Sequence, residues 1–463
     1  MLFDNLDALY KASSNYLTIT GDGISNLQKE VFVERFVDDL AYNAVFNPDR
    51  DVVDACRWLI WHAARECGAW AASINDFYFA RGRGEYADLT VPAVNLRGLT
   101  YDAAQAMFNV INRENIGAFI FEIARSEIGY TAQRPAEYVT SVLAAAVKSG
   151  YEGPVCLQGD HFQFKAKAYL EIPEQELNNI KALVLEAMEA GFYNIDIDAS
   201  TLVDLDYQTL EEQQKLNYEL TSKITEFVRR HEPEGVTVSL GGEIGEVGGK
   251  NSTVEEMQVF MSKHLETLSK MNPAATGISK ISVQTGTSHG GVVLPDGSIA
   301  KVAIDFDTLE KISKAAVRDF GIAGAVQHGA STLPKEAFDK FAVTQTCEIH
   351  LATGFQNIIY DHGNFPAELK GEVYGWINAN LAGERKEGQT DEQFYYKTRK
   401  KGFGPFKQKM WDMPKEIKEP ILKALEDEFA TIFGKLAIFG SRELMLGITK
   451  EVFVPKAKPL CMR

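Results

Sequence analysis

The sequence predicts an α/β protein built on a (β/α)8 TIM barrel with helical N- and C-terminal extensions. Eight short apolar or β-branched runs succeed one another between residues 90 and 365, and amphipathic stretches of helical length separate them. Strands that alternate with helices in this way are typical of a closed parallel barrel. A doubly wound sheet usually has fewer strands and a glycine-rich turn after the first, and no such turn follows the first run here.

Each run predicts one strand, and each gap predicts one helix. The runs are VPAVNL (91–96), AFIFEIA (118–124), PVCLQGDH (154–161), YNIDIDA (193–199), VTVSLGGEI (236–244), ISVQTG (281–286), GAVQHG (324–329) and FQNIIYD (355–361). Apolar residues at helical spacing predict helices at 100–114, 135–149, 173–190, 207–231, 253–271, 306–319 and 335–352.

We therefore expect three parts: a helical N-terminal extension at 1–89, a barrel catalytic domain at 90–365 and a helical C-terminal extension at 366–463. The last part holds the one basic stretch, KTRKKGFGPFKQKMW (397–411). Two interpretations of this stretch stay open. It is either a solvated or subunit-contacting loop, or a contact for phosphate or a partner.

The net charge, the cysteine spacing and the apolar runs limit the classes of function that the sequence supports. The formal net charge is −16, and so acidic a surface disfavours nucleic acid as a partner, although local backbone N–H groups can still bind a small phosphate. The five cysteines show no CxxC spacing, which predicts reduced thiols and a cytoplasmic location. The N-terminus does not resemble a signal peptide, and no apolar run approaches the length of a membrane span.

Catalytic and ligand-binding residues are expected where the strands end, because active sites of barrels lie at the carboxyl ends of their strands. Three of the eight histidines fall there, namely His161, His289 and His328, together with Glu243. Three imidazoles and a carboxylate suit a borderline divalent ion such as Zn²⁺, with Co²⁺ or Mn²⁺ as substitutes. The remaining histidines lack this context: His62, His231, His264 and His350 are interpreted as packing or surface residues, and His362 stays open as a substrate contact.

Asp160 precedes His161 at the end of the third run. Neighbouring strand residues point in opposite directions, but a curled strand end lets both reach one site. A carboxylate beside a metal can act as an acid or base, or it can support a histidine ligand; we favour the first role. The glycines and serine of Ser288-His289-Gly290-Gly291 and His328-Gly329-Ala330-Ser331 predict a phosphate site at the ends of strands six to eight.

These segments together resemble the zinc-dependent class II fructose-bisphosphate aldolase family over residues 90–365. The matching motifs are PAVN (92–95), Asp160-His161, IDAS (197–200), GGEIGEVGG (241–249), SHGG (288–291), QHGAS (327–331) and QNI (356–358). The resemblance implies Asp160 as the proton-transfer residue and His161, Glu243, His289 and His328 around Zn²⁺. It also implies substrate contacts from Asn95, Gly290, Gly329, Ser331 and Asn357, and a homo-oligomer acting on a small sugar or sugar phosphate.

The sequence also departs from that family. Lys250 and Asn251 stand where the family has glutamates, Ile359 replaces an aspartate, and the second glycine of the phosphate loop is Ala330. FEIARSEIGYTAQRPAEY (121–138) is similar to a related group, the Z-type tagatose-bisphosphate aldolase proteins and sugar epimerases. The metal site is therefore expected to be intact and the substrate contacts altered.

Four functions are left open. The favoured one is reversible aldol cleavage of a ketose (bis)phosphate such as fructose 1,6-bisphosphate. A metal-dependent ketose C4-epimerase of the tagatose/fructose type is the alternative, and a non-catalytic binding protein is less favoured. A Schiff-base aldolase needs a lysine inside the barrel, and Lys280 is predicted at the wrong end of its strand.

Overall fold

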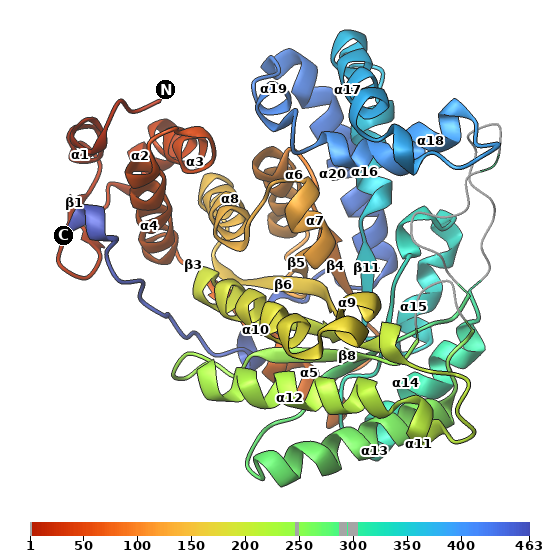
Figure 1. Ribbon diagram of the computed structural model, residues 1–463. Coiled ribbons are helices and arrows are strands. Elements are labelled where there is room, and N and C mark those ends of the chain that lie inside the picture. The colour runs from red at the N-terminus through yellow and green to blue at the C-terminus, as the bar shows by residue number, and fades with distance from the viewer. Residues whose placement is uncertain (1, 246–249, 287–293, 295–303) are drawn as a thin grey trace.

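The computed structural model describes residues 2–245, 250–286, 294 and 304–463 (Figure 1). Eight parallel strands close into a barrel, in the order in which they follow along the chain. They are β4 (Val91–Asn95), β5 (Ile120–Ala124), β6 (Gly153–Gln163), β7 (Asn194–Asp198), β8 (Ser239–Glu243), β9 (Lys280–Val283), β10 (Ala325–Gln327) and β11 (Glu348–Leu351). The pairing of β11 with β4 closes the ring, and the predicted (β/α)8 barrel is confirmed.

Helices surround the strands. They are α6 (Thr100–Arg113), α7 (Arg125–Tyr130), α8 (Pro135–Lys148), α9 (Ala166–Glu171), α10 (Pro173–Ala190), α11 (Leu210–Gln213), α12 (Lys215–His231), α13 (Val254–Met271), α14 (Phe306–Phe320), α15 (Asp339–Val343) and α16 (Thr353–Asp361). Alternate strand residues such as Ile195 and Ile197 are fully buried. They face these helices, because neighbouring side chains of a strand point to opposite faces.

The eighth strand was predicted in the wrong place. FQNIIYD forms helix α16, and the strand is instead β11, inside the stretch expected to be helical. Adjacent Ile358 and Ile359 suggest a strand, but Phe355 and Ile359 are four residues apart and both buried, which is helical spacing. In β11 the polar residues Glu348 and His350 alternate with Ile349 and Leu351, as in a strand with a polar inner face.

The N-terminal segment holds more than helices. Its elements are α1 (Leu6–Ser13), β1 (Thr18–Ile19), β2 (Ile24–Ser25), α2 (Lys29–Arg35), α3 (Val37–Phe46), α4 (Arg50–Glu66), β3 (Ala69–Ala72) and α5 (Asn75–Gly82). Strand β3 pairs with residues 153–156 of β6, whereas β7 pairs with residues 158–163 of the same strand. A ninth strand thus extends the sheet at the amino end of β6.

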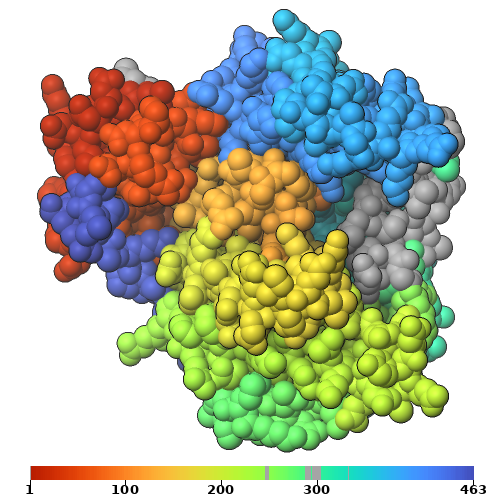
Figure 2. Space-filling view, in the orientation of Figure 1, coloured from red at the N-terminus to blue at the C-terminus, as the bar shows by residue number. Residues whose placement is uncertain are grey.

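The C-terminal segment folds back over both other parts. Its helices are α17 (Ala367–Asn380), α18 (Asp391–Thr398), α19 (Lys407–Trp411), α20 (Lys415–Lys435) and α21 (Arg442–Ile448). Figure 2 shows the part of this segment that holds α17, α18 and α19 (blue) beside the N-terminal helices (red) along one end of the molecule, where Tyr42 donates a hydrogen bond to Asp412. The last residues run along α4, and the indoles of Trp58 and Trp61 donate to the carbonyls of Lys456 and Val454.

Candidate active site

A β-bulge in β6 brings Asp160 and His161 to the same side of the strand. The register between β6 and β7 shifts between Gly159 and Phe162, and His161 has a φ of +43°, which is uncommon for a residue with a Cβ. A bulge re-aims side chains in this way, so both residues line the central cavity. A Cβ at Gly159 would lie 2.4 Å from the Phe162 ring, which explains the glycine at this place.

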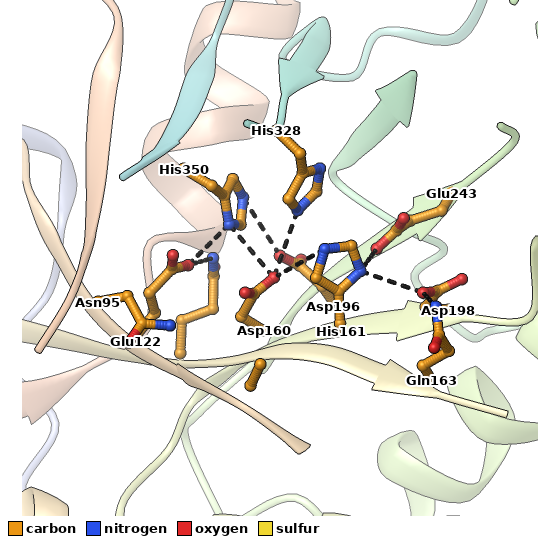
Figure 3. A network of polar contacts seen from close by, with 12 residues as sticks. Asn95, Glu122, Asp160, His161, Gln163, Asp196, Asp198, Glu243, His328 and His350 are labelled. Carbon is orange, nitrogen blue, oxygen red and sulfur yellow. Dashed lines mark hydrogen bonds and ion pairs between the residues drawn. The ribbon is translucent and has the colours of Figure 1, made fainter. Parts of the chain in front are cut away.

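Acidic and histidine side chains from six strand ends converge at this point (Figure 3). They are Glu122 of β5, Asp160 and His161 of β6, Asp198 of β7, Glu243 of β8, His328 directly after β10, and His350 of β11. All except His161 are buried, and the His161 side chain is 13% exposed. The predicted residues Asp160, His161, Glu243 and His328 therefore lie together at the carboxyl end of the barrel, with Glu122, Asp198 and His350 beside them.

Two carboxylates hold one side of the His161 ring. Its Nδ1 lies 2.8 Å from Glu243 Oε1 and 3.1 Å from Asp198 Oδ2. Gln163 donates a 2.6 Å hydrogen bond to the same Asp198 oxygen. Burial, and then repulsion from Asp198, raises the pKa of Glu243 to about 8. Carboxylates that face one nitrogen of an imidazole fix its orientation and increase its basicity.

Asp160 stands between three imidazoles. Its Oδ1 lies 3.3 Å from His328 Nε2, 3.3 Å from His350 Nδ1 and 3.7 Å from His161 Nε2. Burial alone would raise the pKa of Asp160, but His161 and His350 outweigh it and hold the pKa well below its ordinary value. Burial and the two neighbouring imidazoles lower the pKa of His328. Asp160 is therefore ionised and His328 neutral, and a neutral imidazole is the form that binds metal.

His350 was missed by the sequence analysis, which treated it as a packing or surface residue on a helix. It lies on β11, with Nδ1 2.8 Å from Glu122 Oε2 and Nε2 2.7 Å from Glu348 Oε1. Burial disfavours the protonated form of the His350 ring and would lower its pKa. The carboxylates of Glu122 and Asp160 favour that form more strongly, so the pKa of His350 is raised. The ring centroids of His350 and His328 are 3.9 Å apart. The polar-apolar alternation of Glu348-Ile349-His350-Leu351 was the available signal for this strand.

Lys280 lies deeper in the barrel, below the histidines. Its Nζ is 2.9 Å from Asp196 Oδ1, 2.5 Å from Glu348 Oε1 and 2.8 Å from Gln158 Oε1. A Cβ at Gly241 would lie 2.2 Å from Asp196 Oδ1, so the glycine leaves room for this pair. Burial opposes the charge, but Asp196 and Glu348 outweigh it and raise the pKa of Lys280. A buried ammonium that is fully hydrogen-bonded is a poor nucleophile.

A cavity of about 810 Å³ opens above the cluster, and its wall is basic. The basic residues that line it are Arg97, Arg125, Lys165, Lys397 and Lys400. Arg97 pairs with Glu127 at 2.7 Å and Arg125 with Glu176 at 2.5 Å. Lys400 makes no ion pair in the part of the chain that the structure describes, and burial, then repulsion from Arg97, lowers its pKa. The basic C-terminal stretch thus reaches the cavity.

The other predicted substrate residues fall into three groups. Asn95, Gly329 and Ser331 line the cavity, and Asn95 donates to Glu127 while its Oδ1 accepts no hydrogen bond among the described residues. Asn357 lies on α16 and bonds Tyr396 and Arg399 instead of lining the cavity. His289 and Gly290 lie outside the described residues.

One of the residues that depart from the family pattern is Lys250. It pairs with Glu256 and does not line the cavity.

The donor set fits a divalent cation. His161, His328 and Glu243 supply imidazole nitrogen and carboxylate oxygen, which are the donors that Zn²⁺ binds in catalytic sites. Ligand atoms of Asp160, His161 and His328 lie within 4.8 Å of one another, and so do those of His161, Asp198 and Glu243. The buried Oε1 of Glu243 accepts no hydrogen bond from the described residues despite its contact with His161.

None of the described helices is long and apolar enough to cross a membrane.

Comparison with known sequences identifies relatives of this barrel. A family model described as class-II fructose-bisphosphate aldolase matches residues 83–419. A fructose-bisphosphate aldolase from Giardia intestinalis is 23% identical over 244 residues, which is 50% of this chain. The chain spans 62% of the length of that relative.

Comparison with solved structures finds the same architecture. A probable tagatose 6 phosphate kinase from Sinorhizobium meliloti 1021 has a TM-score of 0.52 and 16% identity, over 81% of this chain and 96% of that one. The fructuronate-tagaturonate epimerase from Cohnella laeviribosi has a TM-score of 0.47 and 13% identity, over 76% of this chain and 82% of that one. At 16% identity, the likeness to the Sinorhizobium protein describes the fold alone.

Proposed function

Because the chain belongs to the class II fructose-bisphosphate aldolase family, we propose that it is a metal-dependent class II aldolase. The reaction is the reversible aldol cleavage of a ketose (bis)phosphate, such as fructose 1,6-bisphosphate, to glycerone phosphate and an aldehyde. The observation that carries the proposal is the position of Asp160, whose carboxylate lies 3.3 Å from His328 Nε2 at the floor of a cavity that Arg97, Arg125, Lys165, Lys397 and Lys400 also line.

His161, His328 and Glu243, with His289, would hold Zn²⁺ or another divalent ion. When bound, the ion polarises the ketose carbonyl and stabilises the negative charge that develops on its oxygen. His161 stays in place because Asp198 Oδ2 lies 3.1 Å from its Nδ1.

Asp160 carries the proton. In the cleavage direction its carboxylate accepts the proton of the substrate C4 hydroxyl, the C3–C4 bond breaks, and the electron pair of that bond passes into the enediolate of the three-carbon product. The enediolate takes up one proton to become glycerone phosphate, and Asp160 releases the proton that it accepted. In the condensation direction Asp160 returns that proton to the new hydroxyl. A positioned general base of this kind accelerates a reaction by about 10²–10⁴-fold.

The cavity binds an anionic substrate. Gly329 has a φ of +71° and lines the cavity together with Ser331; a glycine turn of this kind suits one phosphate at the end of the seventh strand. Arg97 and Lys400 line the same cavity and suit a second anionic group. Asn95 presents its Oδ1 for a sugar hydroxyl.

Product analysis tests the proposal. The metal-loaded protein is incubated with a panel of ketose mono- and bisphosphates and unphosphorylated ketoses, and the products are followed by NMR. An aldolase releases two carbonyl fragments from at least one phosphorylated ketose. Recovery of an intact ketose with inverted C4 identifies the protein as an epimerase and overturns the proposal, and an Asp160→Asn variant with unchanged cleavage overturns the role of Asp160.

A further inference from the structure

We propose that Arg399 is a positioning residue for substrate binding, because it fixes the turn that presents Lys397 and Lys400 to the anionic group of the sugar. The inference rests on the proposed function, which supplies that anionic sugar. Tyr396, Lys397 and Lys400 line the substrate cavity, whereas Arg399 does not. They belong to the end of α18 and to the 3₁₀ turn at 399–402 that follows it. Figure 1 shows α18 beside α16, so the C-terminal segment supplies this part of the cavity wall.

Three hydrogen bonds tie the Arg399 guanidinium to helix α16. Its Nη1 donates to Asp361 Oδ1 at 2.6 Å, and its Nη2 donates to Asp361 Oδ2 at 2.7 Å. The same Nη2 donates to Asn357 Oδ1 at 2.7 Å. Two parallel hydrogen bonds between a guanidinium and a carboxylate fix direction as well as distance, and Arg399 is only 4% exposed. The side chain of Arg399 therefore has one orientation relative to α16.

Helix α16 also holds the backbone and a neighbour of Arg399. The Tyr360 hydroxyl donates to the Arg399 carbonyl at 2.9 Å, and Asn357 Nδ2 donates to the Tyr396 hydroxyl oxygen at 2.9 Å. The ring centres of Tyr360 and Tyr396 lie 5.4 and 5.2 Å from Arg399 Cζ, which is within the range of a cation–π contact. One helix thus holds the side chain of Arg399, its carbonyl group and the tyrosine three residues before it.

The contacting residues of α16 share one face of the helix. Asn357, Tyr360 and Asp361 are three and four residues apart, and side chains at this spacing lie on the same side. Asp361 is the last residue of α16, where the negative end of the helix dipole disfavours a carboxylate. Pairing with Arg399 explains its place better than helix stability does, and Lys370 is farther away, at 3.5 Å. Asn357, expected as a substrate contact, thus acts on the substrate through Arg399.

The lysines on either side of Arg399 have no ion pairs that would hold them. Among the residues that the structure describes, neither Lys397 nor Lys400 pairs with a carboxylate, whereas Lys401 pairs with Glu384 at 2.6 Å. A lysine ammonium sits on a flexible four-carbon chain, so its place depends on the backbone that carries it. Placement of charged groups around a substrate supports binding and reaction. Both ammonium groups reach one cavity, which suits a phosphate of the ketose.

Ligand binding tests the proposal without reference to turnover. All proteins are loaded with Zn²⁺ and carry Asp160→Asn, which prevents proton transfer, and NMR titration gives the dissociation constant for fructose 1,6-bisphosphate. We expect Arg399→Gln to weaken binding about 10-fold, which is typical of a lost contact between charged groups. Arg385→Gln is the matched control, because Arg385 pairs with Asp391 at 2.6 Å and lies 5.4 Å from the Phe394 ring but does not line the cavity. It should bind like the parent protein.

A second background separates positioning from a purely structural role. In a protein that lacks both lysines, Lys397→Gln with Lys400→Gln, the change Arg399→Gln should alter the dissociation constant by no more than about 2-fold, because residues that act through one another are not additive. A loss in that background as large as in the parent protein overturns the proposal. Unchanged binding in Arg399→Gln alone overturns it as well.

Asp361→Ala covers the case in which Arg399→Gln fails to fold, because the Asp361 side chain is 53% exposed. This change removes both carboxylate acceptors, so it should weaken binding as Arg399→Gln does, and unchanged binding overturns the role of the pair. Absence of binding to the parent protein also overturns the proposal. Binding that follows these expectations in a protein that fails to cleave the ketose contradicts the aldolase reaction alone, so the two proposals fail separately.

Discussion

At the scale of single residues, the site depends on backbone geometry that places two consecutive side chains in one cavity. His161 adopts φ +43° in the bulge of β6, and such a conformation persists where the surrounding structure enforces it. The Phe162 ring packs where a Cβ of residue 159 would lie. The proposed ligand His161 and the proposed proton carrier Asp160 therefore both depend on Gly159.

Replacing Gly159 by alanine should weaken metal binding. The added Cβ would lie 2.4 Å from the Phe162 ring, and overpacking of this kind costs about 1–3 kcal/mol. The measurements are Zn²⁺ affinity by titration calorimetry and the free energy of unfolding by urea denaturation. Gly375→Ala on α17 is the control, because nothing lies within 4 Å of its Cβ, and it should be neutral or slightly stabilising. Unchanged Zn²⁺ affinity in Gly159→Ala would contradict the role given to the bulge.

Replacing Lys400 by glutamine should raise the KM for a phosphorylated ketose about 10-fold or more, since a hydrogen bond between charged groups contributes about 1.5–3 kcal/mol. Lys400 lines the cavity, whereas Lys401 pairs with Glu384 at 2.6 Å. Steady-state kinetics of Lys400→Gln and of the control Lys401→Gln check this. An equal change in both variants, or an equal change with an unphosphorylated ketose, argues against a phosphate contact.

At the scale of elements, buried polar groups also occur between the outer helices. His264 of α13 is fully buried and lies 3.0 Å from Ser222 Oγ of α12. Burial, and then repulsion from Arg229, lowers its pKa to about 4. Below its ordinary pKa of 6.5 the unfolded chain binds a proton that the folded protein does not, so His264 contributes stability that is lost as the pH falls from 6.5 to 4.

The His264→Gln variant should therefore show a flatter loss of stability in acid. Between pH 7 and pH 5 the wild-type protein should lose roughly 2 kcal/mol more of its free energy of unfolding than the variant does. Urea denaturation at a series of pH values, with metal-free samples of both proteins, measures the difference. Parallel pH profiles would show that His264 keeps its ordinary pKa in the folded state.

Elements also show how far the sequence predicts the fold. The barrel and seven of its strands could be predicted, because each run is apolar and each gap has helical period. The eighth strand could not, since β11 directly follows a helical stretch, while the β-branched pair Ile358-Ile359 suggested a strand further on. That single error moved His350 from the barrel interior to a helix.

The candidate site was predictable where its residues occur in short motifs. Asp160-His161, Glu243 and the His328 loop each end a strand that the pattern locates. Arg97, Arg125 and Lys400 come from three different segments, and only the folded chain shows that they line one cavity. Asn357 was predicted from its motif, but the helical geometry of α16 directs it to Tyr396 and Arg399.

At the scale of the whole molecule, the two ends of the chain support each other outside the barrel. The C-terminal residues cover α4, where Lys456 Nζ lies 3.8 Å from the centre of the Trp61 ring and donates to the carbonyl of Ala190. Two indole hydrogen bonds also end on this segment. The C-terminal tail thus holds the N-terminal helices against α10.

Deleting residues 450–463 should destabilise the protein by about 3 kcal/mol, since each lost hydrogen bond costs about 1 kcal/mol and the two indoles gain apolar exposure. The emission of Trp58 and Trp61 should shift to longer wavelength, and thermal unfolding should begin at a lower temperature. Leu460→Ala is the control, because Leu460 is 80% exposed. A deletion with unchanged Tm would show that the tail contributes no stability.

The central claim is that a divalent ion held by His161, His328 and Glu243 drives carbon-carbon cleavage. The most direct measurement follows cleavage of fructose 1,6-bisphosphate, or of the best ketose phosphate found, before chelation, after removal of metal and after return of Zn²⁺. We predict that the chelated protein loses activity and that Zn²⁺ restores it. Activity that survives chelation, with borohydride trapping of the substrate on the chain, would contradict the claim and point to a Schiff base.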